Sequence, residues 1–201
     1  FPGGVLPSTS FYFSKMSVSD WNSLLSFSSA QEFSTMNRTP EVVKWDNDFS
    51  LYLAENGGHD LTTCLFHRAD SLAPPAAVLS ISLADKVEAE RMMKELADFS
   101  VGEGHAAQSS PVGYCNTPER RYPIYKLPQT TLFAQLTSFV NSSPSIFLTF
   151  YGNRLLMSPD EDGLSQYIKQ LSRGEVLGEG AVYQAGIDGL SDSYQFMLMA
   201  D

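Results

Sequence analysis

Residues 145–171, SIFLTFYGNRLLMSPDEDGLSQYIKQL, contain the most informative pattern in the chain. Two apolar runs, residues 145–151 and 154–158, flank the pair Gly152-Asn153. A glycine and an asparagine between two such runs are typical of a tight hairpin turn. Apolar residues then recur at the spacing of one helix face, at Leu164, Tyr167, Ile168 and Leu171. The stretch therefore predicts an antiparallel hairpin followed by an amphipathic helix.

A similar order of elements is expected upstream. Thr39-Pro40-Glu41 is typical of a helix start, and this helix should end near Asp46-Asn47. Residues 49–55 alternate in the manner of a strand, with Phe49, Leu51 and Leu53 on one face. Asn56-Gly57-Gly58 should form a tight turn that leads to a partner strand at residues 61–67.

The remaining elements are predicted from the same two patterns, the alternation of a strand and the spacing of one helix face. A helix capped by Asp85, with Glu88 as its capping-box partner, should bury Val87, Met92, Met93 and Leu96 and expose Lys86, Glu90, Arg91 and Lys94. Other helices should begin near residues 21 and 130. Further strands are expected at residues 10–16, 77–83, 112–116, 122–127 and 194–199.

The predicted strands are interrupted by single helices, and many of the strands are joined as hairpins. This order differs from the regular strand–helix alternation of a parallel doubly wound sheet. The sequence predicts an α+β fold, with a mostly antiparallel sheet and helices packed on one face. We treat residues 1–201 as one α+β region. Residues 49–97 and 145–171 both contain strands followed by a helix, so an alternative is two related subdomains divided near residues 100–111.

Composition excludes several classes of protein. Of the 201 residues, 43% are hydrophobic and 18% are charged, and these proportions suit a packed core rather than a disordered acidic tail. The net charge of -10 argues against binding to nucleic acid or to an anionic membrane surface, both of which need Lys and Arg. No apolar run reaches the ~18 residues of a transmembrane helix. The loop-like start at Phe1 and a strand-like segment close to the end indicate a piece of a longer chain.

Local motifs for catalysis or metal binding do not match. Asp160-Glu161-Asp162-Gly163 resembles the start of a calcium loop, but ligand positions 5 and 12 fall on Leu164 and Leu171. These acids are better explained as the beginning of a helix. His59, His67 and His105 have no metal-site spacing, and no nucleophile motif is present. The sequence therefore assigns no catalytic residue, metal ligand or cofactor.

One compact patch combines basic and aromatic residues: Arg120, Arg121, Tyr122 and Tyr125. Such a patch can bind an anion or the edge of a carbohydrate. It can equally be a hairpin turn whose charges pair with nearby acids. We take these four residues as the candidate binding residues.

The two cysteines, Cys64 and Cys115, are 51 residues apart and lie in strand-like segments. Two interpretations remain open from the sequence. Both residues can be small buried core side chains, or they can form one disulfide in an oxidising compartment.

Three segments carry a resemblance: residues 6–12 (LPSTSFY), 147–158 (FLTFYGNRLLMS) and 164–171 (LSQYIKQL). The chain resembles the extracytoplasmic region of uncharacterised envelope proteins of gut Gram-negative anaerobes, which carry a membrane anchor or a lipoprotein signal. The resemblance implies a periplasmic or outward-facing location, with anchoring through a preceding segment. Asp70-Ser71-Leu72 is then similar to the O-glycosylation acceptor motif of such bacteria, with Ser71 as the acceptor.

The expected function is a non-catalytic binding or scaffolding module of the bacterial envelope. Its partner would be another envelope protein or a glycan. Two alternatives stay open. One is a hydrolase with a dispersed site made of histidine and carboxylates from separate loops. The other is a purely structural domain of a larger envelope protein.

Overall fold

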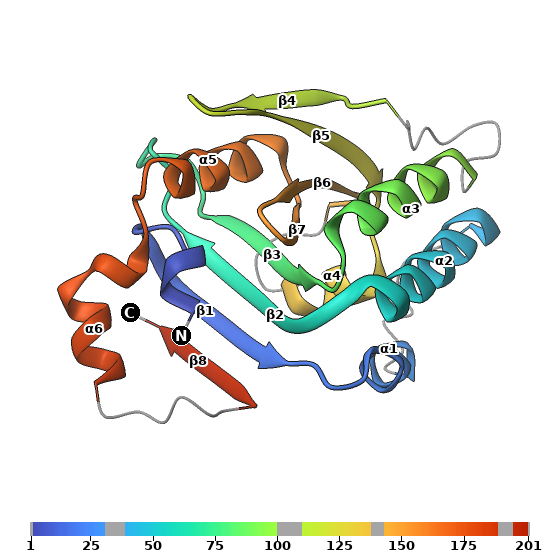
Figure 1. Ribbon diagram of the computed structural model, residues 1–201, viewed down its shortest axis with the longest axis horizontal. Coiled ribbons are helices and arrows are strands. Elements are labelled where there is room, and N and C mark those ends of the chain that lie inside the picture. Colours follow the sequence, from blue (N-terminus) through green and yellow to red (C-terminus); the bar gives the residue numbers. More distant parts are fainter. Residues whose placement is uncertain (1, 31–38, 100–109, 138–142, 189–194, 201) are drawn as a thin grey trace.

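The computed structural model describes residues 2–30, 39–99, 110–137, 143–188 and 195–200. Eight antiparallel strands form one sheet in the order β4-β5-β6-β7-β3-β2-β1-β8 (Figure 1). Their bounds are β1 Ser10–Ser17, β2 Gly57–Phe66, β3 Ala76–Leu83, β4 Gly113–Asn116, β5 Arg121–Pro128, β6 Ser145–Tyr151, β7 Arg154–Ser158 and β8 Phe196–Ala200. The predicted α+β class with an antiparallel sheet is confirmed.

Helices accompany the sheet on both faces. In the described residues they are α1 Trp21–Ala30, α2 Pro40–Asn56, α3 Lys86–Phe99, α4 Thr131–Thr137, α5 Glu161–Ser172 and α6 Ala181–Ile187, with short 3-10 turns at Pro2–Val5 and Leu177–Glu179. Figure 1 shows α1, α2 and α3 grouped on one side of the molecule and α5 and α6 on the other. The expectation of helices on one face therefore accounts for only part of the arrangement.

Two hydrophobic clusters explain why both faces are covered. Successive residues of a strand point to opposite faces, so Leu79 and Ile81 of β3 join one cluster while Ala76 and Val78 join the other. The first cluster contains side chains from α2, α3 and α4, and the second contains side chains from α5 and α6. A sheet that is apolar on both faces needs cover on both.

The hairpin expected around Gly152-Asn153 is present. β6 and β7 pair with Tyr151 opposite Arg154, and Gly152 has a φ of 56°. This left-handed conformation strains any residue with a Cβ, so glycine suits the turn. The helix after the hairpin is α5, and Leu164, Tyr167 and Ile168 are fully buried on its inner face.

The segment expected to form a strand at residues 49–55 is helical instead. α2 runs without a break from Pro40 to Asn56, capped at its start by the Thr39 hydroxyl. Its buried residues are Trp45, Phe49, Tyr52, Leu53 and Asn56, which follow the helical spacing. Leu51 is 63% exposed, so the apparent alternation of residues 49, 51 and 53 is a coincidence of composition.

The expected turn at Asn56-Gly57-Gly58 is also wrong, because β2 begins at Gly57 directly after α2. A Cβ at Gly57 would lie 2.3 Å from the indole nitrogen of Trp21, so only glycine fits this approach. The Trp21 indole N–H donates to the carbonyl oxygen of Gly58 at 2.9 Å. β2 then pairs with β1 and β3 rather than with residues 49–55.

The two halves of the chain build one continuous sheet. β3 from the first half pairs with β7 from the second, and the halves share the order strand, helix, strand, strand, helix. The first half places two consecutive helices at the first helical position, and the second half begins with an additional strand, β4. Residues 100–109 of the expected division lie outside the described residues. A relation between the halves therefore stays a prediction, and the described strands of both halves belong to one sheet.

Helix α3 begins as expected but buries a different set of residues. The Asp85 carboxylate accepts from the backbone N–H groups of Val87 and Glu88 at 2.8 and 3.1 Å. Val87 is 79% exposed, contrary to the expected stripe, and the buried residues are Ala89 and Met93. Among the described residues, no helix is both long and apolar enough to cross a bilayer.

Candidate functional site

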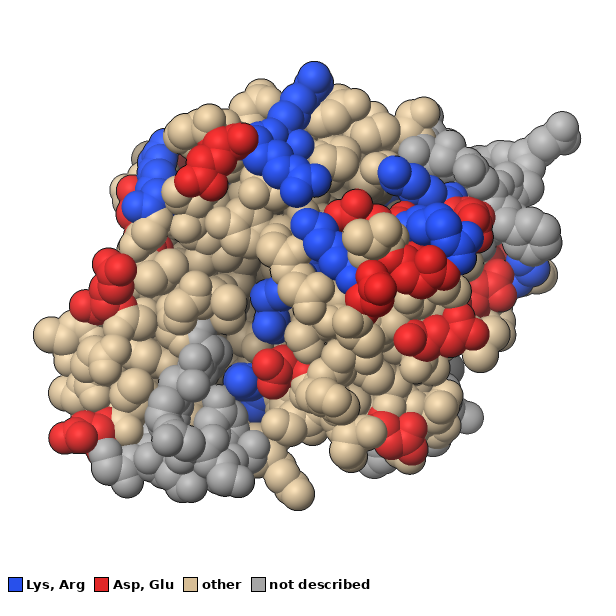
Figure 2. Space-filling view, in the orientation of Figure 1, with Lys and Arg blue, Asp and Glu red and all other residues tan. Residues whose placement is uncertain are grey.

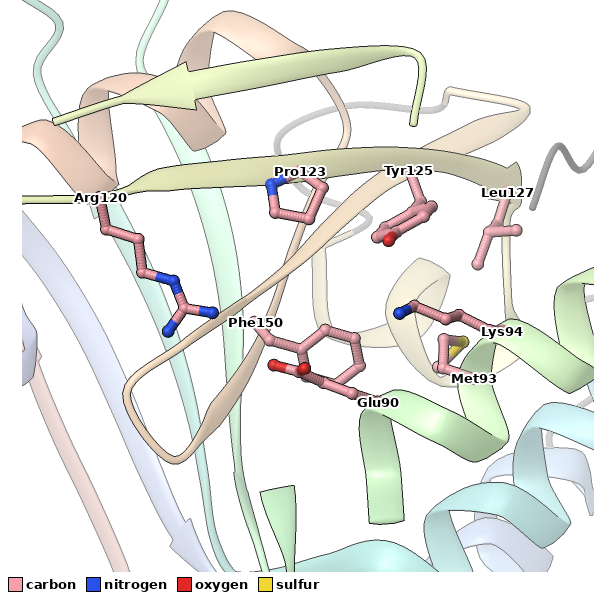
Figure 3. A pocket seen from close by; sticks show the side chains of 8 residues that line it. All are labelled: Glu90, Met93, Lys94, Arg120, Pro123, Tyr125, Leu127 and Phe150. Atoms are coloured by element: carbon pink, nitrogen blue, oxygen red, sulfur yellow. The ribbon is translucent and has the colours of Figure 1, made fainter. Parts of the chain in front are cut away.

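A cavity of about 190 Å³ lies between α3 and β5, on the sheet face that the first helices cover (Figure 3). Its wall is formed by the side chains of Glu90, Met93, Lys94, Arg120, Pro123, Tyr125, Leu127 and Phe150. Met93, Tyr125, Leu127 and Phe150 are buried and make the interior apolar. The charged side chains lie at the mouth. The cavity therefore combines an apolar interior with a charged rim.

Helix α3 contributes one wall through residues that share a face. Glu90 and Lys94 are separated by one helical turn, and Met93 lies between them on the side that faces the sheet. The Lys86 ammonium lies 3.7 Å from the Glu90 carboxylate. The charge of Glu90 is thus partly neutralised by Lys86 of the same helix. Lys94 adds a positive charge at the mouth of the cavity.

Strand β5 contributes the opposite wall through its alternation. Pro123, Tyr125 and Leu127 point to the same face because a strand repeats every two residues. Phe150 reaches the cavity from β6, which pairs with β5. Burial raises the pKa of the Tyr125 phenol, and the neighbouring Glu90 and Tyr114 add to the rise. Tyr125 is therefore a neutral wall residue at physiological pH.

The structure brings Arg120 and Tyr125 together at the cavity, and it also places the Arg120 guanidinium near the Tyr122 ring. Arg120 and Tyr125 line the cavity. Tyr122 points to the other face of the sheet, where its ring lies 5.2 Å from that of Tyr151. Arg121 stacks on the ring of Tyr114 in β4, with 3.5 Å between the guanidinium carbon and the ring centre. Tyr122 and Tyr125 therefore lie on opposite faces of the sheet, and the four side chains do not share one face.

The turn before β5 holds Arg120 in place. The Thr117 hydroxyl accepts from the backbone N–H of Arg120 at 3.1 Å and donates to its carbonyl oxygen at 2.8 Å. The Arg120 guanidinium lies 5.5 Å from the centre of the Tyr122 ring. Figure 3 shows the side chain directed toward Phe150 and Glu90 across the mouth of the cavity.

The titratable side chains of the cavity wall are those of Glu90, Lys94, Arg120 and Tyr125. The cavity wall contains no histidine, cysteine, serine or threonine among the described residues. His59 is exposed and contacts the carbonyl oxygen of Val18 at 3.3 Å. The ring centre of His67 lies 4.5 Å from that of Phe11, and His105 lies outside the described residues. Within the described ranges, no group of three His, Cys, Asp or Glu side chains is placed to hold a metal ion.

Both cysteines are free thiols, so the structure does not form the disulfide that was one interpretation. Cys64 lies 3.2 Å from the hydroxyl oxygen of Ser10, and Cys115 donates to the carbonyl oxygen of Ser165 at 3.6 Å. The thiols belong to β2 and β4, which several strands separate in the sheet. They act as small side chains of the second hydrophobic cluster.

We expect both thiols to be unreactive in the native protein. Burial raises the pKa of the Cys64 thiol to about 12 and raises that of Cys115 as well, so little thiolate forms near neutral pH. At about pH 8, labelling by a thiol reagent should be at least about a hundredfold slower than in guanidinium chloride. Two thiols should titrate after unfolding without a reductant. Titration of none would show a disulfide instead.

Ser71 lies exposed in the turn between β2 and β3. The Asp70 carboxylate accepts from the backbone N–H of Leu72 at 2.9 Å, so a hydrogen bond spans Ser71. The predicted O-glycosylation of Ser71 stays a prediction.

The sequence did not indicate the other residues of the cavity: Glu90, Met93, Lys94, Pro123, Leu127 and Phe150. Glu90 and Lys94 were expected on the solvent face of α3, and Met93 in its buried stripe. The available signal was the spacing of these three on one side of the helix. Only the packing of α3 against β5 shows that they surround a cavity.

Comparison with protein-family models, with curated proteins and with solved structures finds no match for this chain. The function is therefore inferred from the geometry of the cavity and its charges.

Proposed function

We propose that the protein is a non-catalytic binding module of the bacterial envelope, and that its α3–β5 cavity accepts one apolar side chain of an acidic partner polypeptide. The observation that carries this proposal is an apolar cavity with Lys94 and Arg120 at its mouth, in a chain of net charge -10. The envelope setting rests on the resemblance of residues 6–12, 147–158 and 164–171.

The size of the cavity favours a side chain over a complete small-molecule ligand. Pockets for drug-sized ligands usually enclose roughly 300–1,000 Å³, whereas a cavity of about 150 Å³ holds a benzene ring. At about 190 Å³, the α3–β5 cavity has room for one phenylalanine or leucine side chain. Buried anchors of this kind supply much of the binding energy of protein interfaces.

The chemistry of the wall favours a polypeptide over a glycan. Carbohydrates stack on open aromatic faces and need several hydrogen-bonding groups around them. Tyr125 and Phe150 are only 8% and 7% exposed, so neither offers such a face. Met93 and Leu127 complete an interior that contacts apolar groups.

The charges of the mouth favour acidic residues beside the anchor. Lys94 and Arg120 are exposed, and the nearby Glu90 is paired with Lys86 at 3.7 Å. Acidic side chains next to the anchor would meet these two cations. Opposite charges across an interface increase the association rate and exclude partners of the wrong sign.

The proposal predicts selective binding of short acidic peptides. Acetyl-Asp-Phe-Asp-amide should bind saturably in calorimetric and NMR titrations, and acetyl-Asp-Ala-Asp-amide and acetyl-Lys-Phe-Lys-amide should bind at least about tenfold more weakly. The double substitution Lys94→Glu and Arg120→Glu should weaken binding of the acidic phenylalanine peptide by about tenfold or more.

Lys126→Glu provides the matched control. Lys126 is an exposed cation of the same strand, but it points to the other face and lies 5.8 Å from the ring of Phe147. This substitution makes the same type of charge change without altering the mouth, so affinity should stay near that of the unsubstituted protein. Equal binding of the phenylalanine and alanine peptides, or equal losses in Lys126→Glu and the double variant, would contradict the proposal.

A further inference from the structure

Arg154 is a half-buried cation without an acidic partner among the described residues. It begins β7 and points to the sheet face opposite the α3–β5 cavity, as Leu156 does. Its Nε donates to the Ser80 hydroxyl at 2.5 Å, and one Nη donates to the Ser80 carbonyl oxygen at 3.3 Å. A guanidinium has five N–H donors, so three remain for another acceptor.

Burial penalises the charge of this guanidinium. It lowers the pKa of Arg154, while Tyr167 and Asp60 act in the other direction. Asp60 itself forms an ion pair with Lys15 at 3.2 Å. A buried charge is normally compensated by a direct partner, and an oxyanion would supply one here.

The strand register places further polar groups beside Arg154. Thr62 of β2 lies between Lys15 of β1 and Ser80 of β3, and Arg154 of β7 pairs with Ser82 of β3. Alternate residues of a strand point to the same face, and paired residues of neighbouring strands share that face. The face that carries Cys64 and Phe66 therefore also carries the side chains of Lys15, Thr62, Ser80, Ser82 and Arg154. Figure 2 shows a hollow over the middle of the sheet, with basic side chains and an acidic one along its floor and lower edge.

Thr62 adds a second buried polar group on the same face as Arg154. Thr62 is 1% exposed, and its hydroxyl oxygen has no hydrogen-bond partner among the described residues. Buried polar atoms are nearly always satisfied, so a partnerless hydroxyl needs an explanation. A ligand inserted between Arg154 and Lys15 would place a polar group where Thr62 lacks one.

We propose that this part of the sheet binds a small hydroxylated carboxylate of the sugar-acid class. The ligand carboxylate pairs with the free edge of the Arg154 guanidinium, and its hydroxyl groups meet Asp60 and Thr62. Arg154 contributes one positive charge without an acidic partner among the described residues, and a single such charge matches a monoanion better than a phosphate dianion. The ion pair of Asp60 with Lys15 favours a ligand hydroxyl over an ammonium group.

Titration with D-glucuronate tests the proposal, with D-glucose, acetate and inorganic phosphate as comparison probes. D-glucuronate should bind saturably, and each comparison probe at least about tenfold more weakly. Arg154→Gln should weaken D-glucuronate binding by at least about tenfold, because it removes the cation and retains a polar side chain. Thr62→Val should weaken it about threefold or more while the thermal midpoint is maintained or raised, since the orphan hydroxyl is removed.

Thr63→Val is the matched control. Thr63 is the next residue of β2, is 1% exposed and also has a partnerless hydroxyl, but it points to the opposite face. It should alter stability as Thr62→Val does and leave D-glucuronate affinity unchanged.

If Arg154→Gln fails to fold, the two threonine variants decide the question. Absence of saturable D-glucuronate binding, equally tight binding of a comparison probe, or equal affinities in the two threonine variants would overturn the proposal. The acidic peptides probe the other face, so either proposal can fail without the other.

Discussion

Leu53→Ala should lower the free energy of unfolding by about 3 kcal/mol, since loss of a fully buried leucine costs roughly 2–5 kcal/mol. Leu53 is 0% exposed and belongs to the first hydrophobic cluster together with Trp45, Phe49 and Tyr52. The truncation removes apolar contacts and leaves a cavity that the rigid neighbouring rings cannot fill. Denaturant unfolding followed by tryptophan fluorescence measures the change, because Trp45 lies in the same cluster.

Leu51→Ala is the matched control and distinguishes the two interpretations of residues 49–55. In a strand, Leu51 and Leu53 would share a buried face, and both truncations would be costly. In helix α2, Leu51 is 63% exposed, so its truncation should change stability by less than about 0.5 kcal/mol. Similar large losses for both variants would contradict the helical assignment.

Arg68→Met should lower the free energy of unfolding by about 2 kcal/mol, within the range for hydrogen bonds to charged groups. The Arg68 guanidinium donates two parallel hydrogen bonds to the Asp160 carboxylate at 2.8 and 2.9 Å and one to Asp162 at 3.0 Å. Its Nε also donates to the carbonyl oxygen of Pro74 at 2.8 Å. These contacts join the β2–β3 connection to the start of α5, and methionine retains the apolar stem without any of them.

The geometry explains why this pair should matter more than an ordinary surface pair. The Arg68 side chain is only 12% exposed, and Asp160 also accepts from the backbone N–H of Gly163 at 2.7 Å as the cap of α5. Arg173→Met is the control, since Arg173 and Glu175 are 3.8 Å apart and both largely exposed. It should cost less than about 0.5 kcal/mol. Equal effects in thermal unfolding would show that Arg68 does not secure α5.

Local signals were sufficient for several elements. Gly152-Asn153 specifies a tight turn through the conformations that these two residues accept, and Asp85 specifies a helix start through its own carboxylate. Both features depend on neighbours in the chain and need no distant partner. The hairpin β6–β7, α5 and the start of α3 were predicted correctly for this reason.

Local signals failed where two periods fit the same residues. Phe49, Leu51 and Leu53 alternate as in a strand, while Trp45, Phe49, Tyr52 and Leu53 fit a helix. The choice is made by the partner surface, because the helical set packs against the sheet and against α3. The sequence carries both patterns and offers no local means of ranking them.

Local sequence signals were even less sufficient for the candidate sites. The proximity of Arg120 and Tyr125 in the sequence indicated half of the expected binding patch, but alternation along β5 sends Tyr122 to the other face. The cavity also needs Glu90 and Lys94 from a helix some thirty residues earlier in the chain. Arg154, Ser80 and Thr62 meet only through the registers of β7, β3 and β2.

Composition, turn residues and helix caps were enough to establish an acidic α+β protein with an antiparallel hairpin followed by a helix. These properties depend on interactions within a few residues along the chain. Strand order, the helices on both sheet faces, the free thiols, the α3–β5 cavity and the polar side chains around Arg154 depend on which distant segments pair. That pairing is set by the burial of apolar surface across the whole fold, which no single segment contains.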